Sequence, residues 1–343
     1  MSLRSYIIAR ILLTIPMILL LLTFVFLIIR VLPGDPASLH FEKQVDPKLL
    51  QEFKHQLGLD KPIIIQYLDY LAGLLKGDFG KSMQDYSPVS QQIFSAFPAT
   101  LELAISATLI MIIVGVLLGV QASRSYNSSK DHSIRIFGIA SYATPVFFLG
   151  EVLIMIFAIY LHLLPAGDRI YASMSPTGLT IGDFHLRTGL YTIDSILEGN
   201  PSKLVMSLRY LCLPSITLGT VLCGIFIRLT RGNMLETLQS EFVTAARARG
   251  LKERTVVYGY ALRNAFLPIL TMMGLQFAAL LAGAVLTETT FSWPGLGRYL
   301  VDRITFRDYT AIQGVVVFFG LLVAMVSLTV DIIYAYLDPR IRF

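Results

Sequence analysis

The sequence predicts an all-α integral membrane protein, with residues 1–343 forming one transmembrane domain. Of these residues, 55% are hydrophobic and 15% are charged, whereas soluble domains carry about 25% charged residues. The mean hydropathy is +0.66. Six apolar runs, one of them interrupted only by Glu151, are each near the ~20 residues that a helix needs to cross a bilayer.

These six runs define the expected spans. The first run is too long for the apolar core of a signal peptide and has no clear small-residue cleavage site, so we expect it to remain as a helix. An even number of spans puts both termini on the same side of the membrane. The expected spans cover about residues 8–31, 99–123, 137–163, 208–228, 265–288 and 309–334.

The positions of Lys and Arg indicate which side faces the cytoplasm, because cytoplasmic loops carry an excess of these residues. With the N-terminus inside, the inner segments hold 14 basic and 5 acidic residues in 65 positions, and the outer segments hold 14 basic and 15 acidic residues in 137. Both termini and the region 229–263 are therefore expected in the cytoplasm. The positive charge is concentrated in the inner segments, which carry +9 against −1 in the outer ones, so the net charge of +5 fits contact with membrane lipid rather than nucleic acid.

Two outer segments are expected to be structured. The extracytoplasmic loop 32–97 should contain one helix within 46–58 and a second at about 62–75. The second helix would reach about 21 Å, short of the ~30 Å hydrocarbon core, so it should lie at the interface or against other spans. The extracytoplasmic loop 164–207 is polar, with Gly, Pro and Thr clusters that indicate turns and short strands.

The sequence offers little for catalysis, metal binding or nucleotide binding. Residues 77–82, GDFGKS, resemble part of a phosphate-binding loop, but Leu75 stands where that loop needs its first glycine, and a helix precedes it instead of a strand. The sequence contains no HExxH, GxSxG or paired-cysteine metal motif, and its five histidines are scattered. Cys212 and Cys223 would lie about 16 Å apart along one helix, too far for a disulfide.

Glu151 is a candidate functional residue, because a carboxylate near the middle of a span is costly unless it faces a polar cavity or a partner. The alternative is a hydrogen bond that locks neighbouring helices, and the sequence leaves both open. A membrane-embedded enzyme that uses Glu151 and His162 for acid–base chemistry is disfavoured, because a second convergent catalytic group on a facing span is missing.

The basic segment 240–268 lies between two apolar runs and is expected to form two helices joined at Gly250, which suits the left-handed position that ends a helix. Ala245, Ala246 and Ala248 would offer a surface that a partner can approach closely. Arg247 and Arg249 beside them would suit carboxylates on a soluble protein. A basic loop that only satisfies the orientation rule and binds anionic lipid headgroups is the alternative.

Residues 244–250, TAARARG, resemble the cytoplasmic signature of the inner-membrane permease subunits of ABC importers, which reads Glu-Ala-Ala, three residues, then Gly; here Thr244 replaces the Glu. The rest of the chain is similar to the peptide-importer branch of that family along nearly its whole length. The matching stretches are LPGDP at 32–36, LGLDKP at 57–62, GDFGKS at 77–82, ATLELA at 99–104, RLTRGNMLETL at 228–238, ALRNAFLP at 261–268, ETTFSWPGLGRYL at 288–300 and YLDPRIRF at 336–343.

The resemblance implies a type I ABC importer transmembrane domain whose cytoplasmic coupling helix, within 229–263, docks on an ATPase. The residues expected to couple to the ATPase are Thr244, Ala245, Ala246, Arg247, Arg249, Gly250 and Leu251. Ser141, Pro145 and Glu151 are the candidates for the translocation pathway. An exporter is disfavoured, because exporter chains usually fuse their ATPase and this chain ends at Phe343.

The resemblance also implies partners. These are a second homologous permease subunit that forms a heterodimer with this chain, two cytoplasmic ATPase subunits and an extracytoplasmic substrate-binding protein, in the cytoplasmic membrane of a prokaryote. ATP and Mg would be bound by the ATPases, so no cofactor and no catalysis are expected in this chain. The expected cargo is a small peptide, with oligosaccharides, glutathione or nickel complexes as alternatives.

Overall fold

The computed structural model describes residues 3–31, 48, 51, 55, 60–181 and 184–337. Nearly all of the regular secondary structure in this part of the chain is helical, as predicted for an all-α membrane protein. The two described strands, β1 (Leu179–Ile181) and β2 (Phe184–Leu186), pair antiparallel in the outer loop, with Thr180 opposite His185. Most of the helix expected within 46–58 lies outside the described residues.

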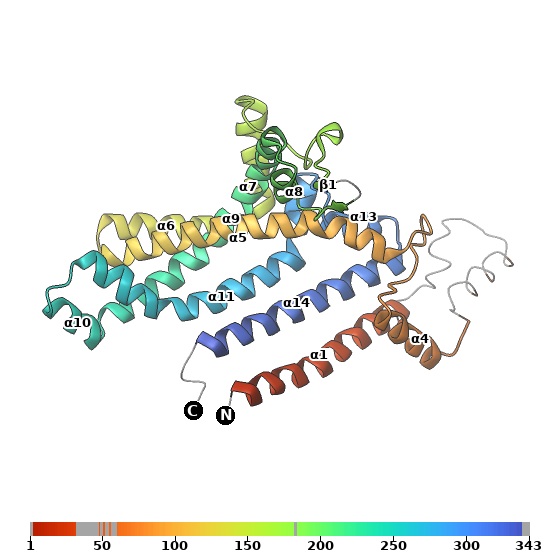
Figure 1. The fold of residues 1–343 in the computed structure, drawn as a ribbon, viewed down its shortest axis with the longest axis horizontal. Helices are drawn as coiled ribbons and strands as arrows, with labels where there is room; N and C mark the ends of the chain where they lie inside the picture. Colours follow the sequence, from red (N-terminus) through yellow and green to blue (C-terminus); the bar gives the residue numbers. More distant parts are fainter. Residues whose placement is uncertain are drawn as a thin grey trace.

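Five helical segments are long and apolar enough to cross a membrane, and a sixth span is formed if a bent helix pair is counted as one. The long helices run side by side along the longest axis of the molecule (Figure 1). This arrangement confirms the all-α membrane fold. The long segments are α1 (Leu3–Val31), α5 (Val89–Arg124), α9 (Pro201–Leu238), η3 (Thr255–Ala261) continued by α11 (Leu262–Gly283), and α14 (Tyr309–Leu337).

The helices α5 and α9 are longer than the apolar runs that predict them. With 36 and 38 residues, they extend about 54 and 57 Å, well beyond the ~30 Å hydrocarbon core. A count of uncharged residues stops at charges such as Glu102 and Arg228. The helices nevertheless continue through Glu102 and Arg231, which bind partners in other elements, Arg169 of the outer loop and Asp131 of α6. The helices therefore continue through charges that appear in the sequence as boundaries.

The third expected span, 137–163, is not one straight helix. α6 (Ser129–Ala143) is followed by α7 (Val146–Leu153) and the π-helix η1 (Ile154–Tyr160), and the two parts meet at 101°. The bend follows from Pro145, which lacks a backbone N–H and forces Thr144 into an extended conformation, with φ −77° and ψ 125°. α7 consequently projects away from the bundle (Figure 1).

Shorter helices connect the long ones. The helix expected at 62–75 is present as α4, and its apolar side chains are strongly exposed, with Ile64 70% and Leu75 90% accessible, as suits the membrane interface. A one-turn helix, η2, lies in the outer loop near the hairpin. The shorter helices are α4 (Ile63–Leu75), η2 (Ala172–Met174), α8 (Tyr191–Leu197), α10 (Glu241–Ala248), α12 (Val285–Thr290) and α13 (Leu296–Thr305).

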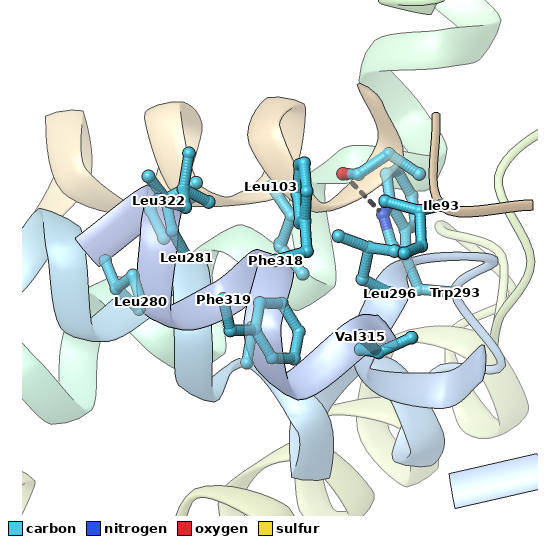
Figure 2. Packing of buried hydrophobic residues seen from close by; sticks show 14 of the residues in the cluster. Ile93, Leu103, Leu280, Leu281, Trp293, Leu296, Val315, Phe318, Phe319 and Leu322 are labelled. Carbon is cyan, nitrogen blue, oxygen red and sulfur yellow. Dashed lines mark hydrogen bonds between the residues drawn. The ribbon is translucent and has the colours of Figure 1, made fainter. Parts of the chain in front are cut away.

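The main apolar core lies where α5 meets α11, α14 and the turn before α13. Figure 2 shows Trp293 pointing toward α5, and its indole Nε1 donates a hydrogen bond of 2.8 Å to the Ala99 carbonyl. This bond satisfies the one polar atom of a side chain that is 1% exposed. The labelled residues around it are Ile93, Leu103, Leu280, Leu281, Leu296, Val315, Phe318, Phe319 and Leu322.

Glu288 explains the glycines of the ETTFSWPGLGRYL stretch. Its fully buried carboxylate accepts hydrogen bonds from the Thr100 hydroxyl, at 2.7 Å, and from the Arg298 amide, at 3.0 Å. A Cβ atom at Gly295 or Gly297 would overlap this carboxylate. The two glycines are therefore needed to let the loop close around Glu288 and hold it against α5.

Close backbone contacts join α9 to its neighbours α5 and α6. A Cβ atom at Gly119 of α5 would lie 2.6 Å from the Cβ of Thr230 on α9, and one at Gly224 of α9 would overlap the Gly138 carbonyl oxygen of α6. Glycine at these positions lets the helix backbones approach closely. Helices α5, α6 and α9 therefore form one tightly packed unit.

Gly224→Ala should destabilise the protein by about 1–3 kcal/mol, because the added methyl group meets backbone that cannot move aside. Thermal unfolding of the detergent-solubilised protein measures the effect. Gly232→Ala on the same helix is the matched control, since no atom lies within 4 Å of its added Cβ. Equal unfolding temperatures for the two variants would contradict the close α6–α9 contact.

Candidate partner-docking site at α10

The helix α10 lies at one tip of the molecule, between α9 and η3 (Figure 1). It follows Ser240, whose backbone is extended, and carries Glu241 in its first turn, where a negative charge is favourable. It ends at Ala248, Arg249 caps it, and Gly250 adopts a left-handed backbone conformation with φ +74°. The predicted helix end at Gly250 is confirmed, and the second helix of the pair is the start of the next span, through η3 into α11.

One face of α10 is buried against the rest of the chain. Val243 and Ala246, three residues apart, are 0% and 3% exposed. They pack in a cluster to which three spans contribute, and Leu251 packs at its edge. The other buried members are Val120 of α5, Met234 of α9, Val256, Val257 and Ala261 of η3, and Ala265 of α11. We call this cluster the α10 seat.

The opposite face of α10 is exposed. Thr244, Ala245, Ala248, Arg249 and Gly250 all lie on the surface. The expectation that Ala246 belongs to this contact surface is not met, because Ala246 shares the inward face with Val243 and is covered by this chain's own spans. Its small side chain instead lets α10 lie close to the seat.

The sequence interpretation did not include Phe242, which is 42% exposed on α10. It precedes Ala245 by three residues and Arg249 by seven, so helical spacing places the three on one face. The signal was present in the sequence as that spacing. We call Phe242, Ala245, Ala248 and Arg249 the α10 outward face; it combines an aromatic ring, two small side chains and a guanidinium.

Arg247 is bound within the chain. Its guanidinium donates to both carboxylate oxygens of Glu253, with the shorter distance 2.9 Å, across the Gly250 turn. The hydrogen bond lowers the pKa of Glu253 and raises that of Arg247. Both side chains are more than 40% exposed, so the pair adds at most ~1 kcal/mol. Arg247 closes the turn, and Arg249 is the exposed charge of the outward face.

The three pathway candidates lie on both sides of the 101° bend. Ser141 is buried on α6 beside Cys223 of α9, Pro145 directly precedes α7, and Glu151 is exposed on α7. Within the described part of the chain, Glu151 makes no ion pair. Its position on a projecting helix differs from the middle of a straight span, and its role in a pathway stays a prediction.

The GDFGKS stretch anchors the outer loop. The Ser82 hydroxyl donates to Asp308 Oδ2 at 2.6 Å, and the Met83 amide donates to Oδ1 of the same fully buried residue, which precedes α14. Helix α4 lies in front of this turn, as expected. Among the described residues, no group of three His, Cys, Asp or Glu side chains could hold a metal ion.

Two ion pairs with buried carboxylates were also missed by the sequence interpretation. Asp131 pairs with Arg231 at 2.7 Å near α10, and Glu102 pairs with Arg169 at 2.6 Å near the opposite end of the bundle. The partners are 100 and 67 residues apart in the sequence. A single sequence holds no signal for pairings at such separations.

Comparisons with known proteins agree with this architecture. Residues 111–343 match the family of binding-protein-dependent transport system inner membrane components, and residues 3–104 match the N-terminal part of that group. The chain is 41% identical to the di/tripeptide transport system permease protein DppB of Pseudomonas aeruginosa, over 98% of both chains. It is 38% identical to the dipeptide transport system permease protein DppB of Escherichia coli, over 94% and 93% of the two chains. It is 35% identical to the glutathione transport system permease protein GsiC of Salmonella typhi, over 99% of both.

Ala246→Leu should lower the stability of the protein by about 1–3 kcal/mol, because the α10 seat has no room for the larger side chain. Ala245→Leu is the matched control and should leave the unfolding temperature unchanged, since its side chain lies on the outward face. Thermal unfolding of both purified variants tests the orientation of α10. The reverse order of stabilities would mean that the helix is turned the other way.

Proposed function

Because this chain belongs to the family of binding-protein-dependent transport system inner membrane components, we propose that it is the permease subunit of an ATP-driven importer of small peptides. The observation that carries the proposal is α10, a short helix fixed on three spans by its buried face, with an outward face of small, aromatic and cationic side chains. Such a helix suits the transmission of force from a partner, because a rigid packed element passes on a displacement.

We propose that an ATPase subunit docks on the α10 outward face. Ala245 and Ala248 allow close approach, Phe242 supplies apolar contact area, and Arg249 pairs with carboxylates on the partner. Closure of the ATPases around ATP and Mg would then push α10 and tilt α5, α9 and α11 through the α10 seat. Hydrolysis belongs to the ATPases in this proposal, and this chain contributes no catalytic group and binds no cofactor.

We also propose the side of the membrane that each end faces. The N-terminal half of α1 lies beside the C-terminal half of α14, with Arg10 3.3 Å from Asp331, and both ends point toward the α10 side of the bundle (Figure 1). The excess of basic residues in the segments at that side favours the cytoplasm. The opposite side, with α8, α13 and the β hairpin, would then meet the extracytoplasmic binding protein.

The remaining partner in the proposal is a second, homologous permease that forms a heterodimer with this chain. Glu151 on the projecting helix α7, together with Ser141 and Pro145 around the bend, is proposed to border the pathway between the two permeases. A carboxylate among apolar side chains in the membrane requires a polar surrounding. A water-filled pathway supplies one.

Small peptides are the proposed cargo, because the relatives named for dipeptide or di/tripeptide transport are 38–41% identical to this chain, whereas the relative named for glutathione is 35% identical. Glutathione, itself a small peptide, is the second candidate. All three relatives are transport permease subunits by name, which supports a transport role.

The cargo can be tested in cells that lack their own peptide permeases and express this chain with its partner permease, ATPases and binding protein. We expect uptake of a radiolabelled dipeptide that depends on the binding protein. Excess unlabelled dipeptide or tripeptide should compete, and excess glutathione should compete weakly. Efficient competition by glutathione and none by dipeptides would contradict the peptide assignment.

Gly250→Val should uncouple ATP hydrolysis from uptake. A β-branched residue at φ +74° costs about 1–2 kcal/mol, and the strain would displace the turn that holds α10 relative to η3. Gly250→Asn is the matched control, since Asn tolerates the left-handed conformation. The ratio of ATP hydrolysed to peptide imported, measured in proteoliposomes, should rise only for the valine variant. Normal uptake by that variant would refute the docking proposal.

A further inference from the structure

We infer that the ion pair between the buried Asp131 and the half-buried Arg231 is a positioning element that transmits the movement of α10 to α6. The inference rests on the proposed transport function and extends it to residues away from the docking surface. It assigns a role to the RLTRGNMLETL stretch, which contains Arg231.

The geometry of the pair is that of a rigid clamp. Arg231 Nε and Nη2 each donate a hydrogen bond of 2.7 Å to a different oxygen of Asp131, whose side chain is 0% exposed. The backbone amide of Asn127 also donates to Asp131, and the ring of Tyr126 lies 5.6 Å from the Arg231 guanidinium. A two-pronged contact of this kind fixes orientation as well as distance.

The Arg231 end of the clamp lies next to the α10 seat. Met234, three residues further along α9 and therefore on the same side of the helix, is fully buried under α10 as a member of the seat. Only Gln239 and Ser240 separate the end of α9 from α10. A displacement of α10 therefore acts directly on the turns of α9 that carry Arg231.

The Asp131 end of the clamp lies in the first turn of α6. Further along, α6 contacts α9 again where Gly138 meets Gly224. With both contacts in place, α6 follows α9 as a rigid body. If the clamp is opened, α6 keeps its apolar contacts further along, where Ile134 packs in one cluster with Ile227 of α9 and Gly138 meets Gly224. Its first turn then has no ionic link to α9 and can stay behind when α9 moves.

A movement passed from α9 to α6 reaches the 101° bend at the end of α6, and Glu151 lies on α7 beyond that bend. The clamp thus connects the α10 outward face to the bend around which the three pathway candidates lie. A second ion pair, Glu102–Arg169, is of similar length, is buried at both partners, and joins α5 to the outer loop at the opposite end. It serves as the comparison for a purely stabilising ion pair.

The experiment uses the complete transporter in proteoliposomes with a radiolabelled dipeptide. Asp131→Asn keeps the shape of the side chain and removes its charge, and Arg231→Lys keeps the charge and removes the two-pronged contact. For Asp131→Asn, we expect the ATP hydrolysed per dipeptide imported to rise about fivefold, the lower end of typical coupling between linked sites. Arg231→Lys should give a smaller rise in the same direction. The melting temperature of each complex is measured in parallel.

Glu102→Gln is the matched control. It should lower the melting temperature of the complex and leave the ratio of ATP to dipeptide unchanged. An unchanged ratio in Arg231→Lys and Asp131→Asn, with or without lower stability, would overturn the inference; if Asp131→Asn does not assemble, the Arg231→Lys result decides. An equal rise in the Glu102→Gln control would also overturn it. Wild-type complex that imports no dipeptide would instead overturn the proposed function, and the inference with it.

Discussion

The close packing of α5 against α9 is the contact on which the rest of the structure depends. Glycines on both helices bring the two backbones together, so α5 and α9 form one rigid unit. α10 continues from α9 and rests on Val120 of α5. α6 is joined to α9, and the Trp293 turn is hydrogen-bonded to α5. Each functional surface is therefore positioned relative to this pair.

The buried charges that the structure describes lie near the ends of the long helices. The buried Asp131, with its half-buried partner Arg231, is near α10, whereas Glu102, Arg169 and Glu288 are at the opposite end. A charge buried in an apolar interior is costly unless it is paired and hydrogen-bonded, and each of these carboxylates accepts at least two hydrogen bonds. At the ends of the long helices, such interactions fix loops and turns to α5 and α9. The middle of the bundle is held together by apolar packing.

The sequence predicts the features that depend on local chemistry, and these include the apolar runs and the helix end at Gly250. Pro145 is a local signal for the bend, but an apolar run does not indicate whether the helix continues through the proline. The orientation of Ala246 depends on which face of α10 meets the bundle, which periodicity alone does not settle for a short helix with alanines on both faces. The Asp131–Arg231 pair depends on a tertiary contact between residues 100 positions apart in the sequence, so no local sequence pattern predicts it.

The two faces of α10 have a consequence for how this protein can diverge. Val243 and Ala246 hold the helix in place, whereas Phe242, Ala245, Ala248 and Arg249 present its surface. Since the two sets share no position, substitutions in the second set should cost little folding stability. In the proposed docking, such substitutions change only what the helix recognises. With that docking, a duplicated gene can acquire a different partner through a few surface substitutions while its membrane scaffold stays unchanged.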